Sequence, residues 1–268
     1  MTVLVWHDGR VIDPSTPIVD ATDHGVLLGD GVFETLAVRD GRPRLLDRHL
    51  RRLQAGMARI DIIDGPDDET IRNAIDELLV ASGLSEARIR ITVTAGPGPS
   101  LRTRTGRPTV FVTIAPLGPA PVSVSLHLVP WPRNEHSALA GIKSINWAEN
   151  AHALRVAAAA GFDNALFCDM QGRLSECATA NIFVTVDGQI LTPAMSTGCL
   201  AGTVRAVLLD AGVATEADLH PADLTRADGV FITTSTTGIT PVHAIDQLTP
   251  PTDVDALGRA RAALDAAD

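Results

Sequence analysis

The chain has 268 residues, of which 45% are hydrophobic and 20% charged, a composition typical of globular proteins with room for two domains. Its formal net charge of −10 disfavours binding to nucleic acid or to anionic lipid. No apolar run reaches the roughly 18 residues that span a bilayer, and the N-terminus lacks the features of a signal peptide. We therefore expect a cytoplasmic protein without a membrane partner.

The first half of the chain alternates between apolar runs of strand length and runs with helical spacing. A segment of Pro, Gly, Ala and Leu at 117–121 then predicts a linker. In chain order we expect a hairpin at 3–12, a strand at 32–38, a helix capped by Asp47, a helix at 68–82, a strand at 87–95, a loop at 96–106 and a strand at 109–115.

The second half mixes the same two kinds of element. We expect strands at 122–129, 165–169, 181–186 and 229–233, and helices at 150–160 and 202–211. The predicted class is therefore α/β (α+β), with a small N-terminal domain at 1–116 and a larger C-terminal domain at 122–268.

Lys143 is the sole lysine among the 22 Lys and Arg residues. Arginine can replace lysine in most surface roles, but imine formation needs an amine that loses its proton, which guanidinium does not do. The neighbours of Lys143 are apolar or small, and burial favours the neutral amine that attacks an aldehyde. The alternative is that Lys143 has no chemical role. It would then be a single lysine left by codon bias, or a lysine at an exposed loop end.

Glu176 lies among small residues just before an apolar strand, which makes it a candidate buried carboxylate that needs a cationic partner. A solvated turn or a helix cap is the other interpretation. Three places could bind a phosphate: Arg52 on a helix, the helix start at Thr203 and Val204, and the hydroxyls of Ser235 and Thr236. Each of these signals is weak when taken alone.

Motifs of other enzyme classes are missing from the sequence. It contains no GxxxxGK[ST] loop, no HExxH helix and no GxSxG turn. Gly29-Asp30-Gly31 lacks a third glycine and precedes a strand, so it is no dinucleotide fingerprint. Cys168, Cys177 and Cys199 show no CxxC spacing, and we expect reduced thiols and no metal site.

The order of several blocks resembles the class IV aminotransferases, the fold-type IV pyridoxal-phosphate enzymes, over nearly the whole chain. The blocks that carry the resemblance are Gly29-Asp30-Gly31-Val32-Phe33-Glu34-Thr35, His49-Leu50-Arg51-Arg52-Leu53, the Lys143 segment, 176–183, 191–193, 198–205 and 235–242. The family includes branched-chain and D-amino acid aminotransferases, (R)-amine transaminases and aminodeoxychorismate lyase. Members have two domains with the cofactor between them and are usually homodimers.

The resemblance implies roles for individual residues. Lys143 would hold pyridoxal 5'-phosphate as a Schiff base and move the substrate proton, and Glu176 would pair with the pyridine nitrogen. Phosphate ligands would be Arg52, Thr203, Val204 and Ser235, with Thr236 as a further cofactor residue near the substrate carboxylate. Substrate residues would be Phe33, Thr35, Arg102, Arg104, Thr236 and Thr237.

The departures from the family pattern bear on the substrate. No tyrosine follows Lys143, where Asn146 and Trp147 stand, which weakens the branched-chain reading. Phe33 stands where D-amino acid enzymes often have tyrosine, and the loop with Arg102 and Arg104 suggests binding of a carboxylate. We expect amino transfer between an amino acid, D-amino acids favoured, and a 2-oxo acid.

The principal alternative is aminodeoxychorismate lyase, which makes 4-aminobenzoate and pyruvate. A branched-chain aminotransferase and an (R)-amine transaminase are weaker alternatives. A cofactor-binding relic without turnover is disfavoured, because Lys143, Glu176 and Arg52 are all retained.

Overall fold

The computed structural model describes residues 3–267, which form two compact units. Unit 1 takes the chain up to Gly118 together with Ile142–Trp147, and unit 2 takes Pro119–Gly141 and the chain from Ala148 onward. The first passage from unit 1 to unit 2 falls within the predicted linker. The segment Ile142–Trp147, which contains the sole lysine, groups with unit 1, whereas the sequence analysis put it in the C-terminal domain.

Unit 1 is built on an antiparallel sheet with the strand order β2-β1-β6-β5-β3-β4. The predicted hairpin and strands of this half are confirmed, with small shifts at their ends. The strands are β1 (Leu4–His7), β2 (Arg10–Ile12), β3 (Gly31–Arg39), β4 (Arg42–Pro43), β5 (Ala87–Thr94) and β6 (Val110–Pro116).

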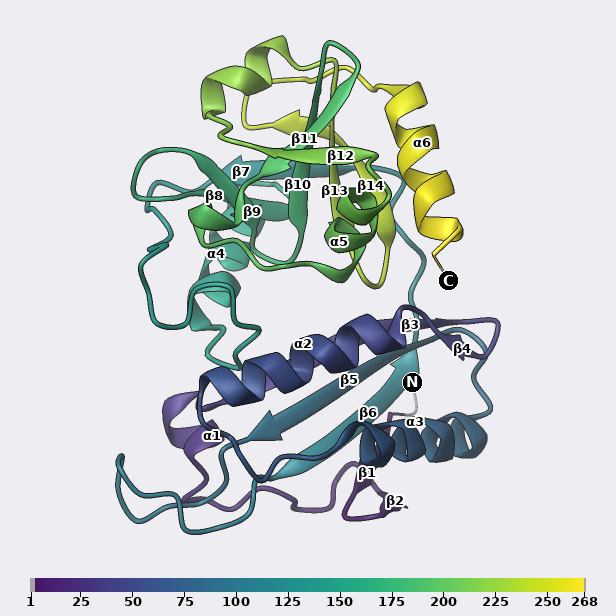
Figure 1. Ribbon diagram of the computed structural model, residues 1–268, viewed down its shortest axis with the longest axis vertical. Coiled ribbons are helices and arrows are strands. Elements are labelled where there is room, and N and C mark those ends of the chain that lie inside the picture. The colour runs from purple at the N-terminus through teal and green to yellow at the C-terminus, as the bar shows by residue number, and fades with distance from the viewer. Residues whose placement is uncertain (1–2, 268) are drawn as a thin grey trace. The chain divides into compact units, whose positions relative to one another are not determined.

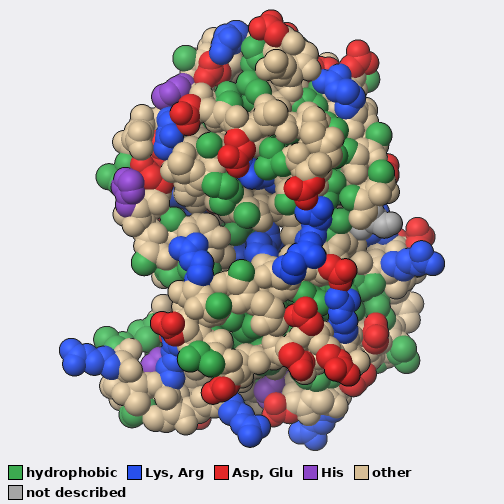
Figure 2. Space-filling model, viewed as in Figure 1, with side chains coloured by type: hydrophobic (Ala, Val, Ile, Leu, Met, Phe, Trp, Pro, Cys, Tyr) green, Lys and Arg blue, Asp and Glu red, His purple; other side chains and the backbone are tan. Residues whose placement is uncertain are grey.

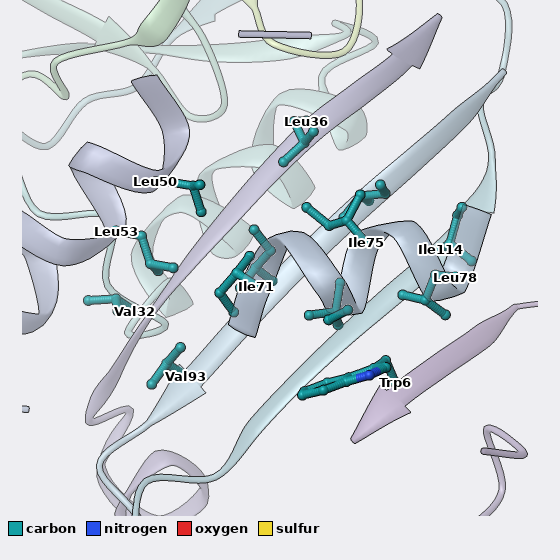
Figure 3. Close-up of a cluster of buried hydrophobic side chains, with 14 of the residues drawn as sticks. Trp6, Val32, Leu36, Leu50, Leu53, Ile71, Ile75, Leu78, Val93 and Ile114 are labelled. Carbon is teal, nitrogen blue, oxygen red and sulfur yellow. The ribbon is translucent and has the colours of Figure 1, made fainter. Parts of the chain in front are cut away.

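The core of unit 1 lies between this sheet and the helices α2 (Leu46–Arg59) and α3 (Asp68–Ser82). Figure 3 shows Leu50 and Leu53 of α2 and Ile71 of α3 turned toward the sheet. On the face that Figure 2 shows, acidic and basic side chains are interspersed over the outer sides of these helices. The apolar residues, which recur every three or four positions, therefore face the sheet, and the polar residues face solvent.

Both helix predictions of this half are confirmed, but one cap is wrong. The helix α3 begins after the N-cap Asp67, whose side chain accepts a hydrogen bond from Thr70 N, and ends at Gly83 in the left-handed conformation. Asp47 was predicted to cap α2, yet the N-cap is Leu45, and Asp47 lies in the first turn. Its negative charge is still favourable there, because it faces the positive end of the helix dipole. The short helix α1 (His24–Leu28) was missed, because five residues are too few to show a helical period.

Unit 2 is built on a mixed sheet with the strand order β12-β11-β10-β13-β14-β7-β8-β9. The strand β9, at one end of this order, also contacts β10, so the sheet curls back on itself. The strands are β7 (Val124–Leu128), β8 (Asn164–Cys168), β9 (Leu174–Cys177), β10 (Asn181–Val186), β11 (Gln189–Pro193), β12 (Ala214–Ala217), β13 (Gly229–Thr234) and β14 (Gly238–Ile245).

Three helices pack on this sheet (Figure 1). They are α4 (Ala148–Ala159) against β8, α5 (Thr203–Asp210) against β12 and β13, and α6 (Val254–Asp265) against β14. The first two match the predicted helices, whereas α6 was not predicted. Two 3₁₀ turns, Met195–Thr197 and Pro221–Arg226, complete the unit. No helix in residues 3–267 has both the length and the apolar character needed to cross a membrane.

A buried ionic cluster fastens α2 to β3 in unit 1. Arg52 Nε and Nη2 each donate a hydrogen bond of 2.7 Å to the carboxylate of Glu34, which has no exposed surface. His49 Nδ1 donates to the same carboxylate at 2.7 Å, since an ionised carboxylate can only accept. Burial raises the pKa of Glu34, but the charge of Arg52 and the hydrogen bonds from Arg52 and His49 outweigh it and lower the pKa to about 2. Burial lowers the pKa of His49 despite the opposing bond to Glu34.

We predict that Glu34→Gln lowers the free energy of unfolding of the apoprotein at pH 7 by about 3 kcal/mol. The reason is that a pKa change from 4.5 to about 2 is worth ~1.4 kcal/mol per unit. Because the folded pKa is depressed, this stabilisation is complete above pH 4.5 and is lost as the pH falls toward 2. The difference between wild type and variant, measured by urea unfolding, should therefore be roughly halved at pH 3.

The matched control is Asp47→Asn, which breaks an exposed pair between α2 and Arg72. Exposed pairs contribute less than about 1 kcal/mol, so this variant should unfold close to wild type. An equal loss in both variants, or a loss in Glu34→Gln that does not change with pH, would contradict the assignment of the stabilisation to the buried cluster.

Candidate active site

Lys143 is held against β3 by backbone hydrogen bonds on either side of it. Phe33 N donates to Lys143 O at 2.9 Å, and Ile145 N donates to Gly31 O at 2.9 Å. Ser144 pairs with Val32 in an antiparallel bridge, so Lys143 and Phe33 lie opposite each other and share one face of the sheet. The position of the sole lysine is therefore set by a regular strand and not by a loose loop.

Gly31 is needed for this pairing. A Cβ atom at Gly31 would lie 2.5 Å from Val93 O and 2.8 Å from Ile145 Cδ1, so any side chain would displace β5 or the Lys143 segment. Gly29 ends α1 in the left-handed conformation, at φ 69°. The two glycines of the Gly29-Asp30-Gly31 motif thus serve a turn and a close backbone approach.

Aromatic rings surround the amine of Lys143. Lys143 Nζ lies 4.5 Å from the ring centre of Phe33 and 5.0 Å from that of Trp147. The two rings meet edge to face, with their centres 5.1 Å apart. Phe33, predicted as a substrate residue, is buried and forms one wall around the amine, and Trp147 forms another.

Arg90 of β5 lies on the same aromatic ring. Its guanidinium carbon is 3.9 Å from the ring centre of Phe33, and its strand position is opposite Thr35, another predicted substrate residue. Arg90 is partly buried, and its Nε donates to Thr92 Oγ1 at 3.3 Å. Burial, together with the charge of Arg88, lowers the pKa of Arg90. Within the part of the chain that the structure describes, Arg90 forms no ion pair, so it remains a cation available to an anionic ligand.

The two loop arginines differ in their surroundings. Arg104 donates to both carboxylate oxygens of Asp30 and to the carbonyl oxygens of Ile60 and Asp61, which fastens the loop to the end of α2. Both Arg102 and Arg104 are exposed, but the guanidinium of Arg104 has a structural task in fastening the loop.

Unit 2 contributes a buried carboxylate. Glu176 lies in β9 with 6% of its surface exposed, not in a solvated turn. Its Oε2 accepts a hydrogen bond of 3.0 Å from Leu200 N, and its Oε1 lies 3.4 Å from Arg133 Nη1. An amide and a guanidinium both favour the ionised carboxylate. Glu176 can therefore present a fixed negative charge to a protonated ring nitrogen.

Unit 2 also offers backbone donors for an anion at the start of α5. The N-cap of this helix is Gly202, which supplies no side-chain cap, and the first turn contains no acidic residue. A Cβ atom at Gly202 would lie 1.9 Å from Asn181 Oδ1, so the close approach of the backbone requires glycine here. The amides of Thr203 and Val204 begin the helix, where N–H groups and the helix dipole favour phosphate.

The turn that follows β13 carries hydroxyl side chains, and β13 itself packs against α5. Thr234 Oγ1 accepts a hydrogen bond of 2.9 Å from Thr237 N, and it lies 2.8 Å from Thr237 Oγ1. These bonds shape the turn that carries Ser235 and Thr236, both half-buried. Thr237, predicted as a substrate residue, thus has a local partner that fixes the turn.

The residues of the two units match the chemistry of pyridoxal 5'-phosphate. Its aldehyde needs an amine, its ring nitrogen needs an anionic partner, and its phosphate needs N–H donors and a cation. Lys143 supplies the amine, and Glu176 supplies the buried carboxylate. The glycine-capped start of α5 supplies a cradle that a Cβ atom would fill. Arg52 supplies a guanidinium oriented by Glu34.

Sequence reasoning missed Arg90 and did not pair Arg133 with Glu176. Arg90 is one of two arginines in a strand of alternating polar and apolar residues, and such residues usually face solvent. Its position opposite Thr35 depends on the strand register, which a single sequence does not specify. The pair of Arg133 with Glu176 joins residues 43 positions apart along the chain, for which no local pattern exists.

Comparison with known proteins places this geometry in a family. The family model described as amino-transferase class IV matches residues 31–245, which is most of the chain. The match includes the predicted cofactor residues Lys143, Glu176 and Arg52.

Three similar proteins illustrate the range of the family. The bifunctional aminodeoxychorismate lyase / D-amino acid transaminase of Mycobacterium tuberculosis is 28% identical over 91% of this chain and 91% of its own length. The D-alanine aminotransferase of Listeria innocua is 29% identical over 92% of this chain and 88% of its own length. A hypothetical aminotransferase from Mycobacterium tuberculosis, solved in a PLP-bound form, has a TM-score of 0.86 at 28% identity, covering 99% of this chain and 98% of that one.

The mixed α/β architecture with its two sheets is that of the fold-type IV transaminases, as the sequence analysis expected. Members of the family are pyridoxal-phosphate-dependent transaminases and aminodeoxychorismate lyases. The chain belongs to the class IV aminotransferase family.

Proposed function

We propose that the protein is an amino acid aminotransferase that moves an amino group between an amino acid and a 2-oxo acid. The observation that carries this proposal is Arg90, a partly buried cation without an ion-pair partner in residues 3–267, stacked on the ring that also contacts Lys143 Nζ. A cation in this place suits a substrate that bears a carboxylate next to its reacting amine. It disfavours simple amines, and so the (R)-amine transaminase alternative.

The chain's own residues have separable tasks in this proposal. When bound, pyridoxal 5'-phosphate supplies an electron sink for the bond that breaks at the substrate α-carbon. Lys143 Nζ binds the cofactor and, once released, takes and returns the substrate proton. Glu176 holds a negative charge for the ring nitrogen. The phosphate ligands would be Arg52, the amides of Thr203 and Val204, and the hydroxyl of Ser235, and Thr236 would be a further cofactor residue.

Substrate binding falls to residues on one face of the unit 1 sheet. Arg90 would bind the carboxylate with two parallel donors, and Phe33 and Trp147 would exclude water from the amine. Thr35 lies opposite Arg90 and can orient a polar group of the substrate. Arg102 remains a second candidate for the carboxylate, while Thr236 and Thr237 are candidates from unit 2.

D-amino acids are the favoured donors, because curated relatives at 28% and 29% identity are named as D-amino acid enzymes. The lyase reaction, which yields 4-aminobenzoate and pyruvate, is the second candidate. It is supported by the bifunctional name of the Mycobacterium tuberculosis relative. Arg90 serves both candidates equally, because the lyase substrate also carries carboxylates. A branched-chain donor is less favoured, because no tyrosine follows Lys143.

We predict that reduction of the holoenzyme with sodium borohydride fixes the cofactor covalently to one peptide. Because Lys143 is the sole lysine, trypsin should release the label only in residues 134–155, and mass spectrometry of the digest reads this directly. Lys143→Arg keeps a cation but has no nucleophilic amine, so it should abolish both the label and turnover. Label elsewhere, or turnover in the variant, would remove Lys143 from its role.

We predict that Arg90→Met raises the Michaelis constant for an amino acid donor by about 10- to 100-fold. A charge-assisted hydrogen bond is worth roughly 1.5–3 kcal/mol, and each 1.4 kcal/mol is a factor of about ten. The matched control is Arg88→Met, because Arg88 is exposed, two residues earlier on the same strand and face. Steady-state kinetics of both variants and of Arg102→Met then assign the carboxylate: an effect confined to Arg102→Met would move the binding role to the loop.

We predict that the purified enzyme forms pyruvate from D-alanine when 2-oxoglutarate is the acceptor. Coupled assays with D-alanine, L-leucine and aminodeoxychorismate as donors test this choice. Faster turnover of aminodeoxychorismate, with pyruvate released in the absence of any 2-oxo acid acceptor, would establish the lyase instead. Faster turnover of L-leucine would restore the branched-chain alternative.

A further inference from the structure

Arg133 lies between the ring of Phe167 and the carboxylate of Glu176. Its guanidinium carbon is 4.3 Å from the ring centre of Phe167, and its Nη1 is 3.4 Å from Glu176 Oε1. Arg133 N donates to Cys168 O at 2.7 Å, which fixes the backbone at the end of β8. Phe167 is fully buried, so one face of the guanidinium is shielded from water by a ring that attracts cations.

The burial of Arg133 is costly. Its side chain is 15% exposed, and its Nε and Nη2 are buried without a hydrogen-bond partner in the described chain. Leaving buried donors unpaired costs roughly 1–3 kcal/mol, and a methionine or leucine would fill this place without that cost. A cation held here despite the cost serves a charge beside it, and the acidic group within 4 Å is Glu176.

The cation of Arg133 favours the ionised form of Glu176. Burial favours the protonated form of a carboxylate, and a protonated acid cannot hold a positive ring nitrogen by charge. Leu200 N donates to Oε2 at 3.0 Å, and Arg133 attracts Oε1 from another direction. Both contacts favour the ionised carboxylate and restrict the orientation of its plane.

We propose that Arg133 is the positioning residue of the cofactor site, which keeps Glu176 ionised and oriented before the cofactor binds. This role deepens the proposed function, and it rests on Glu176 as the partner of the ring nitrogen. It also separates Arg133 from Arg90: Arg133 already has an acidic partner in unit 2, whereas Arg90 forms no ion pair in residues 3–267. Arg133 is therefore not the arginine that binds the substrate carboxylate.

The first test is a double-mutant cycle on the apoprotein, which needs no cofactor and no assumption about the reaction. Arg133→Met keeps the length and packing of the side chain but removes a cation from beside a buried carboxylate, so the urea midpoint should fall. Adding Glu176→Gln to Arg133→Met should return the midpoint toward that of Glu176→Gln alone, because the glutamine carries no charge for Arg133 to stabilise. Strict additivity of the two changes would overturn the proposal.

The second test asks whether charge or packing matters in the holoenzyme. Titration with pyridoxal 5'-phosphate, followed by visible absorption, should show a dissociation constant raised at least about tenfold in Arg133→Met and Arg133→Gln. Arg133→Lys should restore most of this loss, because it restores the cation. If Lys is no better than Met, Arg133 acts by packing alone and the proposal fails. If Arg133→Met impairs folding, the comparison of Arg133→Lys with Arg133→Gln still provides the test.

The matched control is Arg173→Met. Arg173 is buried to a similar degree, with 12% of its side chain exposed, and it also pairs with acids, namely Asp169 and Asp218. The Arg173→Met variant should have a lower urea midpoint. It should show no coupling to Glu176→Gln, and the dissociation constant of the cofactor should not change. Energetic coupling between Arg133 and Glu176 would be measurable even if no amino acid proved to be a donor. Failure of the proposed function and failure of this inference therefore give different results.

Discussion

The pairing of the Lys143 segment with β3 is the constraint on which the catalytic half of unit 1 depends. Two backbone hydrogen bonds add a short strand to the sheet at Gly31 and Phe33, and they place the amine above an aromatic wall. The register then determines the neighbours, because Phe33, Thr35 and Arg90 point to the same face as Lys143. A glycine at position 31 is the condition for this arrangement, since a side chain there would collide with β5 and with Ile145.

The charged residues of the candidate site differ in how they are neutralised. Glu34 with Arg52 and Glu176 with Arg133 are paired inside their units, where desolvation requires a partner of opposite sign. Arg90 is different, because it is partly buried and stacked on Phe33 yet forms no ion pair in residues 3–267. A charge that the fold does not neutralise is available to a ligand. In the proposed function, the paired charges would orient the cofactor ligands, whereas Arg90 would bind the substrate carboxylate.

The two units contribute different kinds of group. Unit 1 supplies side chains on rigid elements, namely an amine on an added strand and a guanidinium fastened to β3. Unit 2 supplies backbone amides at a glycine-capped helix, hydroxyls on a tight turn and one oriented carboxylate. Such pre-organised donors need little rearrangement when an anion binds, because the helix and the turn hold them in place already. The loop with Arg102 and Arg104 is exposed at both arginines and is anchored through Arg104 to Asp30.

The sequence by itself determined the family, the cofactor class and most elements of both units, and it singled out Lys143 as the candidate nucleophile. A sole lysine in an apolar segment, a glutamate before a strand and the limits of α3 are all local signals, because hydrophobic periodicity and caps act over a few residues. Only the tertiary structure showed that Arg90 shares a face with Lys143, that Arg104 binds Asp30 and that Arg133 pairs with Glu176. The structure also showed that Leu45, and not Asp47, is the N-cap of α2. These facts depend on strand register and on contacts between residues 43 to 74 positions apart, and no local pattern encodes either.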